Sequence, residues 1–159
     1  MRILFVCTGN ICRSPTAEGV LRRAIAERAP HLTVEIDSAA THDYHLGNPP
    51  DPRSVAAARQ RGIDISGLRA RLVDVSDFET FDWLIAMDRG HQEQLVAMAP
   101  AKYRARVRLM MDFAPEAFRR EVPDPYYGGP LGFEEVLDLL EEAAAGLVAE
   151  LTSAGERRG

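Results

Sequence analysis

The sequence predicts an α/β fold: a four-stranded, parallel, doubly wound (Rossmann-like) sheet with helices on both faces. Three observations support this prediction. Short apolar runs typical of strands alternate with longer segments of helical periodicity. The first run, Arg2–Cys7, is almost continuously apolar, as expected of a strand buried on both faces of a parallel sheet. The length of 159 residues fits a single domain over residues 1–159.

The first half of the chain predicts strand, helix, strand, loop and helix in turn. Ser14 is a candidate N-cap for the first helix, and Pro15 then occupies its first position. Asp51 caps the second helix in the same way. The expected ranges are Arg2–Cys7 and Leu32–Ile36 for the strands, 41–52 for the loop, and Pro52 to a stop at Gly62 for the second helix.

The second half predicts two more strands and two more helices. Asp88 is the candidate N-cap of a short helix that ends before Pro100. Helical spacing of apolar residues then predicts a long final helix over Phe133–Leu151. The expected strands are Phe81–Met87 and the alternating residues Val107, Leu109 and Met111. Ligands bind at the carboxyl ends of the strands in such sheets, and the loop after Cys7 lies at such an end.

Composition excludes several classes of protein. The net charge is −5, from 19 basic and 24 acidic residues without a Lys/Arg block, which argues against nucleic-acid binding. No apolar run approaches the ~18–20 residues that a membrane span needs. The N-terminal strand carries no signal-peptide pattern, so we expect a cytoplasmic location without membrane association. Only two cysteines, Cys7 and Cys12, are present, which excludes a disulfide scaffold.

The loop Cys7–Ser14 has the features of an anion-binding site with a nucleophile at its base. It contains no proline, so its backbone N–H groups are free to surround a tetrahedral anion. Arg13 offers a planar pair of donors for two phosphate oxygens, and its charge favours the thiolate form of Cys7. Gly9 and Asn10 tolerate left-handed conformations. The expected phosphate-binding loop comprises Thr8, Gly9, Asn10, Ile11, Cys12 and Ser14, with Ser14 donating to the Cys7 sulfur.

Other interpretations of this loop fit less well. A nucleotide P-loop needs a Gly-Lys-Ser/Thr sequence that the loop does not contain. The two cysteines and the histidines show no metal-ligand spacing, so neither a metal nor a cofactor is implied. A structural role for Cys7 as a small buried residue, or a phosphate-binding module without catalysis, remains an alternative.

The segment Cys7–Glu18 resembles the signature loop of the low-molecular-weight protein tyrosine phosphatases. The resemblance extends in order along nearly the whole chain. Its further matching segments are Asp37–Thr41, Gly47–Asp51, Arg61–Ile63, Phe81–Asp88 and Asp124–Gly128.

Thiolate attack on a phosphate monoester expels a poor leaving group unless an acid protonates it. Asp124, held in extended backbone between Pro123 and Pro125, is the candidate acid. The resemblance implies the same role for this aspartate. The expected mechanism has Cys7 attack phosphorus to form a phosphocysteine while Arg13 holds the phosphate oxygens. Asp124 then acts as the base for water.

An aromatic wall of Tyr44, Tyr126 and Tyr127 is expected to select phosphotyrosine in a protein or peptide, as well as small aryl phosphates. Inorganic phosphate or sulfate is expected to fit the same loop. The resemblance implies that the paired tyrosines are substrates for a tyrosine kinase, which is therefore a candidate partner. One alternative is a phosphoarginine phosphatase, in which a threonine typically stands where this chain has Ile11. Another is a glutathione-dependent arsenate reductase, since no cysteine follows Cys12 to relay a disulfide.

The resemblance also bears on the surroundings of the loop. It implies that Cys12 protects Cys7 from irreversible oxidation through a disulfide, and that Ser38 supports Asn10. Leu68 departs from the family pattern, because a histidine that hydrogen-bonds the loop asparagine usually stands there. His42, His45 and His91 are substitutes by residue type alone, and surface positions are the simpler expectation for them. Helix capping accounts for Asp88, so we place it outside the site.

Overall fold

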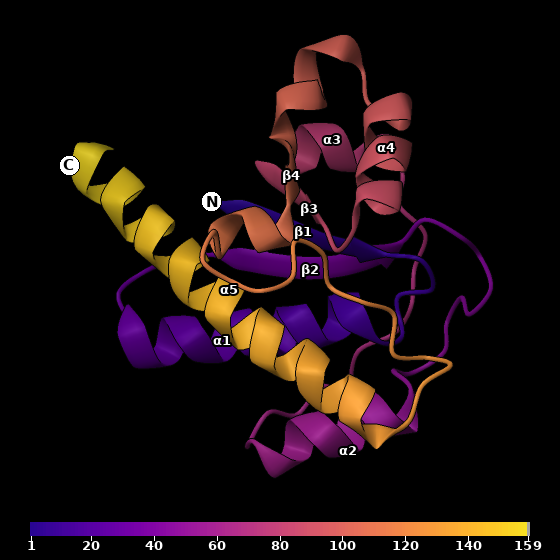
Figure 1. Ribbon diagram of the computed structural model, residues 1–159. Coiled ribbons are helices and arrows are strands. Elements are labelled where there is room, and N and C mark those ends of the chain that lie inside the picture. The colour runs from indigo at the N-terminus through magenta and orange to yellow at the C-terminus, as the bar shows by residue number, and fades with distance from the viewer. Residues whose placement is uncertain (159) are drawn as a thin grey trace.

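The centre of the molecule is a sheet of four strands, and every neighbouring pair in it is parallel (Figure 1). The computed structural model describes residues 1–158, with side chains described through residue 154. The strand order is β2-β1-β3-β4. This confirms the predicted fold class. The strands are β1 (Arg2–Cys7), β2 (Glu35–Ala40), β3 (Trp83–Ala86) and β4 (Val107–Leu109).

Strand β1 is buried on both faces because its side chains alternate between two hydrophobic cores. Ile3 and Phe5 point into one core, and Leu4 and Val6 into the other. Each of these four side chains is completely buried. The continuous apolar run in the sequence therefore reflects a strand with no solvent-facing side.

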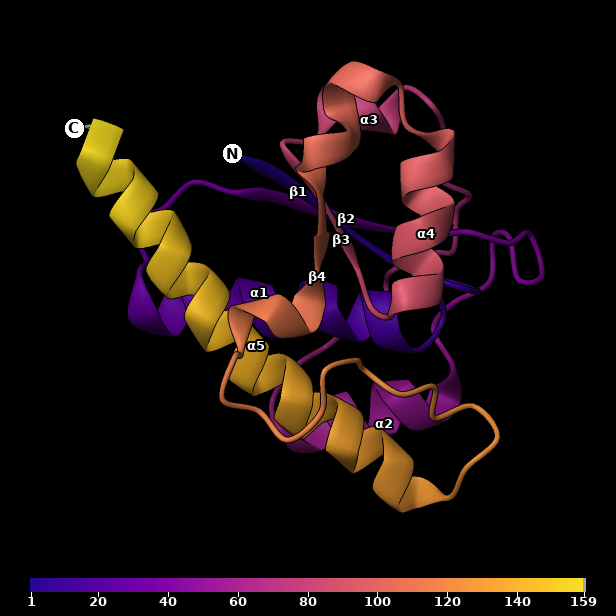
Figure 2. The ribbon, with the colours of Figure 1, turned by 45° about the horizontal axis from the view of Figure 1, so that its top comes forward.

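Helices cover both faces of the sheet (Figures 1 and 2). Three of them, which share a core with Ile3 and Phe5, lie on one face, and the other two lie on the opposite face. The first group is α1 (Arg13–Arg28), α2 (Pro52–Gln60) and α5 (Pro130–Arg158), and the second is α3 (Asp77–Thr80) and α4 (Arg89–Met98). Two 3₁₀ helices, η1 (Ala101–Arg106) and η2 (Met110–Phe113), flank β4.

Helix α5 packs closely against the 3₁₀ helix η2 at Gly146. A Cβ atom at this position would lie 1.9 Å from the carbonyl oxygen of Phe113. Such an overlap is impossible, because this oxygen belongs to the backbone and cannot move aside. A glycine inside a helix costs ~1 kcal/mol relative to alanine. Here the glycine lets the long helix lie directly on the segment that leaves β4.

Several predicted boundaries are wrong. The second strand is Glu35–Ala40 rather than Leu32–Ile36, because Ser38 is hydrogen-bonded within the protein and so can be buried, while the Asp37 side chain stays half-exposed. The first helix begins at Arg13, so Ser14 lies inside it and is not its N-cap. The fourth strand ends at Leu109, and Met111 belongs to η2. The third strand is shorter than predicted, and the last helix begins earlier, at Pro130.

The other two predicted helix starts are confirmed. The Asp51 carboxylate accepts the backbone N–H of Arg53 at 2.8 Å, and the Asp88 carboxylate accepts that of His91 at 2.9 Å. Within residues 1–158, none of the helices combines the length and apolar character that crossing a membrane requires.

The topology places one strand end at the centre of the sheet's carboxyl edge. From β1 the chain crosses to β2 on one side and later returns to β3 on the other. Such a reversal of strand order opens a crevice at the carboxyl ends of the strands. Cys7 is the last residue of β1, so the loop that follows it lies at this crevice.

Candidate active site

The loop between β1 and α1 depends on the conformation of Asn10. Among the described residues it is the only non-glycine with positive φ, at 58°. Its side chain is buried and forms three hydrogen bonds: Nδ2 donates to Ser14 Oγ at 2.8 Å and to Ser38 Oγ at 2.9 Å, and Oδ1 accepts from Arg71 N at 3.1 Å. These bonds hold a strained backbone turn in place.

Gly9 does not adopt the left-handed conformation that its identity suggested. Its lack of a side chain makes room for His45 instead. A Cβ atom on Gly9 would lie 2.8 Å from His45 Cδ2. The glycine therefore permits a close approach of the 41–52 loop to the phosphate-binding loop.

Cys7 is buried, and its sulfur contacts the start of α1. Cys7 Sγ lies 3.0 Å from Ser14 Oγ, and the backbone N–H of Ser14 donates to the sulfur at 3.4 Å. Both donors belong to the first turn of a helix, where the dipole favours negative charge. The surroundings thus suit a thiolate at this position.

Arg13 is held by groups from two other segments. Its Nη1 donates to Asp88 Oδ2 at 2.8 Å and to the Val122 carbonyl at 3.1 Å. Among residues 1–154, whose side chains the structure describes, its Nε and Nη2 groups find no hydrogen-bond acceptor, so they are available to an oxyanion. The side chain is only 5% exposed. A guanidinium anchored in this way presents a preorganised pair of donors.

Asp88 has a second function that sequence reasoning missed. It caps α4 as predicted, and it is also the ion-pair partner of Arg13. Burial acts to raise the pKa of Asp88, but the His91 backbone N–H together with the hydrogen bond and the charge of Arg13 outweigh it and hold the pKa below its ordinary value. The carboxylate is therefore ionised. The sequence did offer one indication of this role, because Asp88 lies between the end of a strand and the start of a helix, where ligand-binding residues of such sheets are found.

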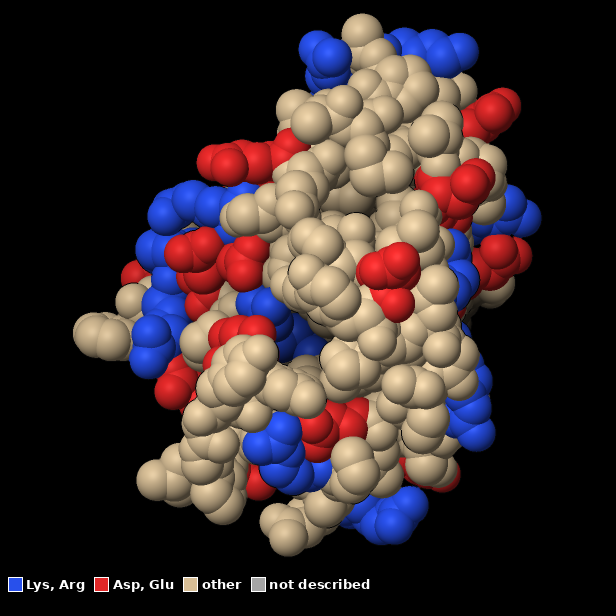
Figure 3. Space-filling view, turned by 90° about the vertical axis from the view of Figure 1, so that its right-hand side faces the viewer, with Lys and Arg blue, Asp and Glu red and all other residues tan. Residues whose placement is uncertain are grey.

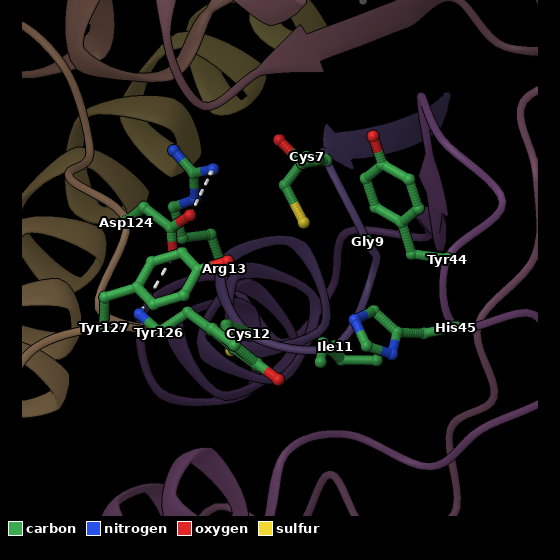
Figure 4. Close-up of a pocket in the computed structure, with 11 residues that line it drawn as sticks. Cys7, Gly9, Ile11, Cys12, Arg13, Tyr44, His45, Asp124, Tyr126 and Tyr127 are labelled. Atoms are coloured by element: carbon green, nitrogen blue, oxygen red, sulfur yellow. Dashed lines mark hydrogen bonds and ion pairs between the residues drawn. The ribbon is translucent and has the colours of Figure 1, made fainter.

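Asp124 lies on the loop that faces the Arg13 side of the crevice (Figure 4). Its Oδ2 is 3.8 Å from Arg13 Nη2, and its Oδ1 accepts the backbone N–H of Tyr126 at 3.0 Å. The side chain is 46% exposed. A carboxyl group placed here can exchange protons with solvent and with a group bound beside Arg13.

The side chains of Cys7, Arg13 and Asp124 line one cavity of about 550 Å³. Figure 4 shows the Cys7 sulfur facing the space between Arg13 and Tyr44. Figure 3 shows mixed basic and acidic side chains on the face at the right of Figure 1, with a hollow near its centre. The lining residues are Cys7, Thr8, Gly9, Ile11, Cys12, Arg13, Tyr44, His45, Asp124, Tyr126 and Tyr127.

The three tyrosines lie around this cavity. Tyr126 meets Tyr127 edge to face, with ring centroids 4.9 Å apart, and the Arg53 guanidinium lies 5.3 Å from the Tyr126 ring centroid. Tyr44 stacks on His42 at 5.2 Å. Tyr44 and Tyr127 are largely exposed, and Tyr126 is half-buried. The rings are thus accessible to a ligand at the mouth of the cavity.

Ser38 contacts Asn10 as expected, and its hydroxyl in turn donates to Glu18 Oε1 at 3.0 Å. Glu18 is buried, and burial raises its pKa above the ordinary range. Leu68 packs against the core and makes no such contact. The backbone N–H of Arg71 supplies the bond to Asn10 Oδ1 instead. The loop therefore keeps a full set of partners without a histidine at position 68.

One of the histidines differs from expectation. His91 is buried rather than on the surface, and its Nε2 lies 2.8 Å from Thr8 Oγ1. Cys12 is a buried free thiol, and burial raises its pKa to about 12. Nothing in the sequence spacing distinguishes His91, because its burial depends on the packing of α4. Within the described residues, no group of His, Cys, Asp and Glu has an arrangement that could hold a metal ion.

Comparisons with known proteins agree with this geometry. The sequence model of the family "low molecular weight phosphotyrosine protein phosphatase" matches residues 2–157. The low-molecular-weight protein-tyrosine-phosphatase of Streptomyces coelicolor is 41% identical over 160 residues, covering 99% of this chain and 97% of that protein. The Homo sapiens phosphatase of the same kind is 38% identical over 136 residues, covering 84% and 85%.

A solved structure gives the same result. The crystal structure of a protein tyrosine phosphatase from Entamoeba histolytica, with Hepes in its active site, superposes with a TM-score of 0.93 at 39% identity, covering 98% of this chain and 99% of that one. Sequence and structure agree along almost the entire length. The chain therefore belongs to the low-molecular-weight phosphotyrosine protein phosphatase family.

Proposed function

We propose that this chain hydrolyses phosphotyrosine in proteins or peptides, with Cys7 as nucleophile, Arg13 as phosphate-binding residue and Asp124 as general acid. One observation carries the assignment of roles. These three side chains, from three separate segments, line the same cavity. A phosphocysteine mechanism is general to the family to which the chain belongs.

In the first step the Cys7 thiolate attacks phosphorus, and an S–P bond forms as the bond to the phenolic oxygen breaks. The free donors of Arg13 and the N–H groups of the loop stabilise the equatorial oxygens. Asp124 transfers its proton to the departing oxygen, so a phenol leaves rather than a phenoxide. The Ser14 hydroxyl, 3.0 Å from the sulfur, supports the thiolate by hydrogen bonding.

In the second step Asp124, now a carboxylate, accepts a proton from water as the water oxygen attacks phosphorus. The S–P bond breaks, and its electron pair returns to Cys7 as a thiolate. The partial exposure of Asp124 supports this step, since water must reach it. The products are inorganic phosphate and the regenerated enzyme.

The lining of the cavity supports an aromatic phosphate ester as substrate. Tyr44, Tyr126 and Tyr127 offer ring surfaces at its mouth, and Ile11 adds an apolar contact. A phosphoarginine substrate would bring a guanidinium group with several donors, for which Ile11 offers no acceptor. We therefore propose phosphotyrosine in preference to phosphoarginine or arsenate.

The test compares kcat/KM on a phosphotyrosine peptide and phosphoarginine with the rate of arsenate reduction in the presence of glutathione. We expect the phosphotyrosine peptide to be favoured by about a hundredfold or more, which corresponds to at least ~2.7 kcal/mol of differential transition-state binding. Cys7→Ser is expected to abolish turnover while still binding inorganic phosphate. Asp124→Ala is expected to slow esters of poor leaving groups more than p-nitrophenyl phosphate. Undiminished turnover by Cys7→Ser would refute the mechanism, and a preference for phosphoarginine or arsenate would refute the substrate.

The exposed ring of Tyr127 also supports a tyrosine kinase as a partner. Treatment of the protein with a tyrosine kinase, followed by peptide mass spectrometry, is expected to find phosphate on Tyr127 ahead of the half-buried Tyr126. Its absence from both rings would contradict this partner.

A further inference from the structure

His91 is a buried imidazole for which the proposed mechanism has no use. It lies on α4 and is only 3% exposed. Its Nε2 is 2.8 Å from Thr8 Oγ1, and its Nδ1 is 3.1 Å from Asp88 Oδ1. A buried polar ring costs free energy unless its nitrogens find partners. Both of its nitrogens face groups adjoining the phosphate-binding loop, so the ring is placed to act on that loop.

The chemistry of these neighbours determines the tautomer. The Asp88 carboxylate is ionised and can only accept, so a lone pair on Nδ1 at 3.1 Å would be repelled. Nδ1 therefore carries the proton, although its angle to Asp88 is too poor for a hydrogen bond. Nε2 is then an acceptor, and the Thr8 hydroxyl donates its proton to it.

Each nitrogen of the imidazole is connected to part of the phosphate site of the proposed function. Nε2 contacts Thr8 directly, and Nδ1 faces Asp88, which binds Arg13. Thr8 directly follows Cys7, and its carbonyl accepts the backbone N–H of His42 at 3.0 Å. The Thr8 side chain is thus fixed by α4, and its backbone by the 41–52 loop. Asp88 in turn holds Arg13 at 2.8 Å. One ring therefore connects the start of the loop with the arginine near its end.

We propose that His91 is a positioning residue that orients the Thr8 hydroxyl and the Asp88 carboxylate, and through them the phosphate-binding loop and Arg13. This inference rests on the proposed function. His91 does not touch the reacting atoms. It keeps two parts of the anion site in a fixed relation, which preorganises them for phosphate.

The experiment is a double-mutant cycle between Thr8→Val and His91→Leu, with the inhibition constant of inorganic phosphate and kcat and KM on p-nitrophenyl phosphate as readouts. We expect each single variant to weaken phosphate inhibition about tenfold, since small displacements of binding groups have effects of this size. The double variant is expected to be no worse than His91→Leu alone, because Thr8→Val breaks a bond that His91→Leu has already removed. His91→Gln, which restores a polar end group, is expected to recover part of the loss.

Leu95→Val is the matched control. Leu95 is a fully buried residue of the same helix, but it belongs to the hydrophobic core. We expect it to lower the free energy of unfolding without changing phosphate inhibition. If His91→Leu fails to fold, the comparison of Thr8→Val with His91→Gln carries the test.

Additive effects in the cycle, or normal phosphate inhibition in all His91 and Thr8 variants, would overturn the inference. So would a Leu95→Val variant whose phosphate inhibition is weakened to the same extent. The proposed function fails separately, if the wild-type protein does not hydrolyse a phosphotyrosine peptide or if Cys7→Ser retains turnover.

Discussion

Asn10 of the phosphate-binding loop donates a hydrogen bond to Ser38 of strand β2 across 2.9 Å. The bond ties a left-handed turn to the neighbouring strand of the sheet, and the buried carboxyl of Glu18 supports Ser38 from behind. The loop is therefore braced by the rigid centre of the fold before any ligand binds. This bracing leads to the first prediction.

Substitutions of Asn10 separate its backbone conformation from its hydrogen bonds. Asn10→Gly keeps the left-handed turn but removes all three side-chain bonds, so we expect kcat to fall about tenfold. Asn10→Ala adds backbone strain and should lose a further ~1 kcal/mol of stability. Steady-state kinetics and urea unfolding measure the two effects. Full activity in Asn10→Gly would show that the loop does not need these bonds.

Substitutions of Asp88 separate its cap from its ion pair. Asp88→Asn retains a good helix cap but places a neutral amide beside Arg13, so we expect weaker phosphate inhibition with nearly normal stability. Asp88→Ala should also lose ~1 kcal/mol of stability through the missing cap. Phosphate inhibition and thermal unfolding of the two variants are compared directly. Equal phosphate inhibition in Asp88→Asn and wild type would mean that Arg13 is positioned without this carboxylate.

Much of the site could be predicted because its residues lie in one short segment. Cys7, Arg13 and the loop between them follow directly from a strand that ends in a phosphate-binding sequence. Asp124 was predicted because the leaving group needs an acid and the resemblance implies this aspartate for the role, and the structure brings this distant residue to the same cavity.

The groups around the site could not be predicted in the same way. His91 has ordinary sequence surroundings, and only the packing of α4 on the sheet buries it beside the loop. The second strand was misplaced because it contains Asp37 and Ser38, which look unfavourable in a buried strand. The hydrogen bond from Asn10 that makes burial of Ser38 possible, and the bond from Arg71 to the half-exposed Asp37, come from residues far away in the chain.

The buried thiol of Cys12 leads to a prediction about oxidation. Because burial raises its pKa to about 12, Cys12 is protonated near neutral pH and forms a disulfide with oxidised Cys7 slowly. We expect the fraction of peroxide-treated enzyme that dithiothreitol reactivates to rise with pH. Cys12→Ser serves as the control and is expected to lose this recovery. Equal recovery of Cys12→Ser and wild type would exclude a protective disulfide.

Leu68→His tests whether the departure from the family pattern limits activity. Both N–H groups of the Asn10 amide have acceptors, and Arg71 already donates to its oxygen. A histidine could therefore add only one bond, while removing a half-buried leucine from the core. We expect kcat to change by less than about threefold and the protein to lose about 1 kcal/mol of stability. A tenfold gain in kcat would show that the loop of the natural sequence lacks a hydrogen bond that it needs for full activity.

The free energy of unfolding is expected to depend on pH through His91. Burial and the charge of Arg13 lower the pKa of His91 to about 4, against the opposing effect of Asp88 and Asp124 and with a small contribution from His42. An unfolded histidine titrates near ~6.5. Between these values the unfolded chain binds more protons than the folded one, so stability falls as the pH decreases from ~6.5 towards 4. Below that range both states are protonated, and this contribution no longer changes.

Urea unfolding of the wild type and of His91→Gln at about pH 7 and about pH 4.5 measures this contribution. The wild type is expected to lose more stability than the variant between the two conditions, because glutamine does not titrate. His31→Gln is the matched control, since it makes the same substitution at an exposed residue outside the site. The buried carboxyl of Glu18, whose raised pKa has the opposite effect on acidification, is common to all three proteins and cancels in the comparison. Parallel losses in wild type and His91→Gln would mean that His91 is not held neutral in the folded protein.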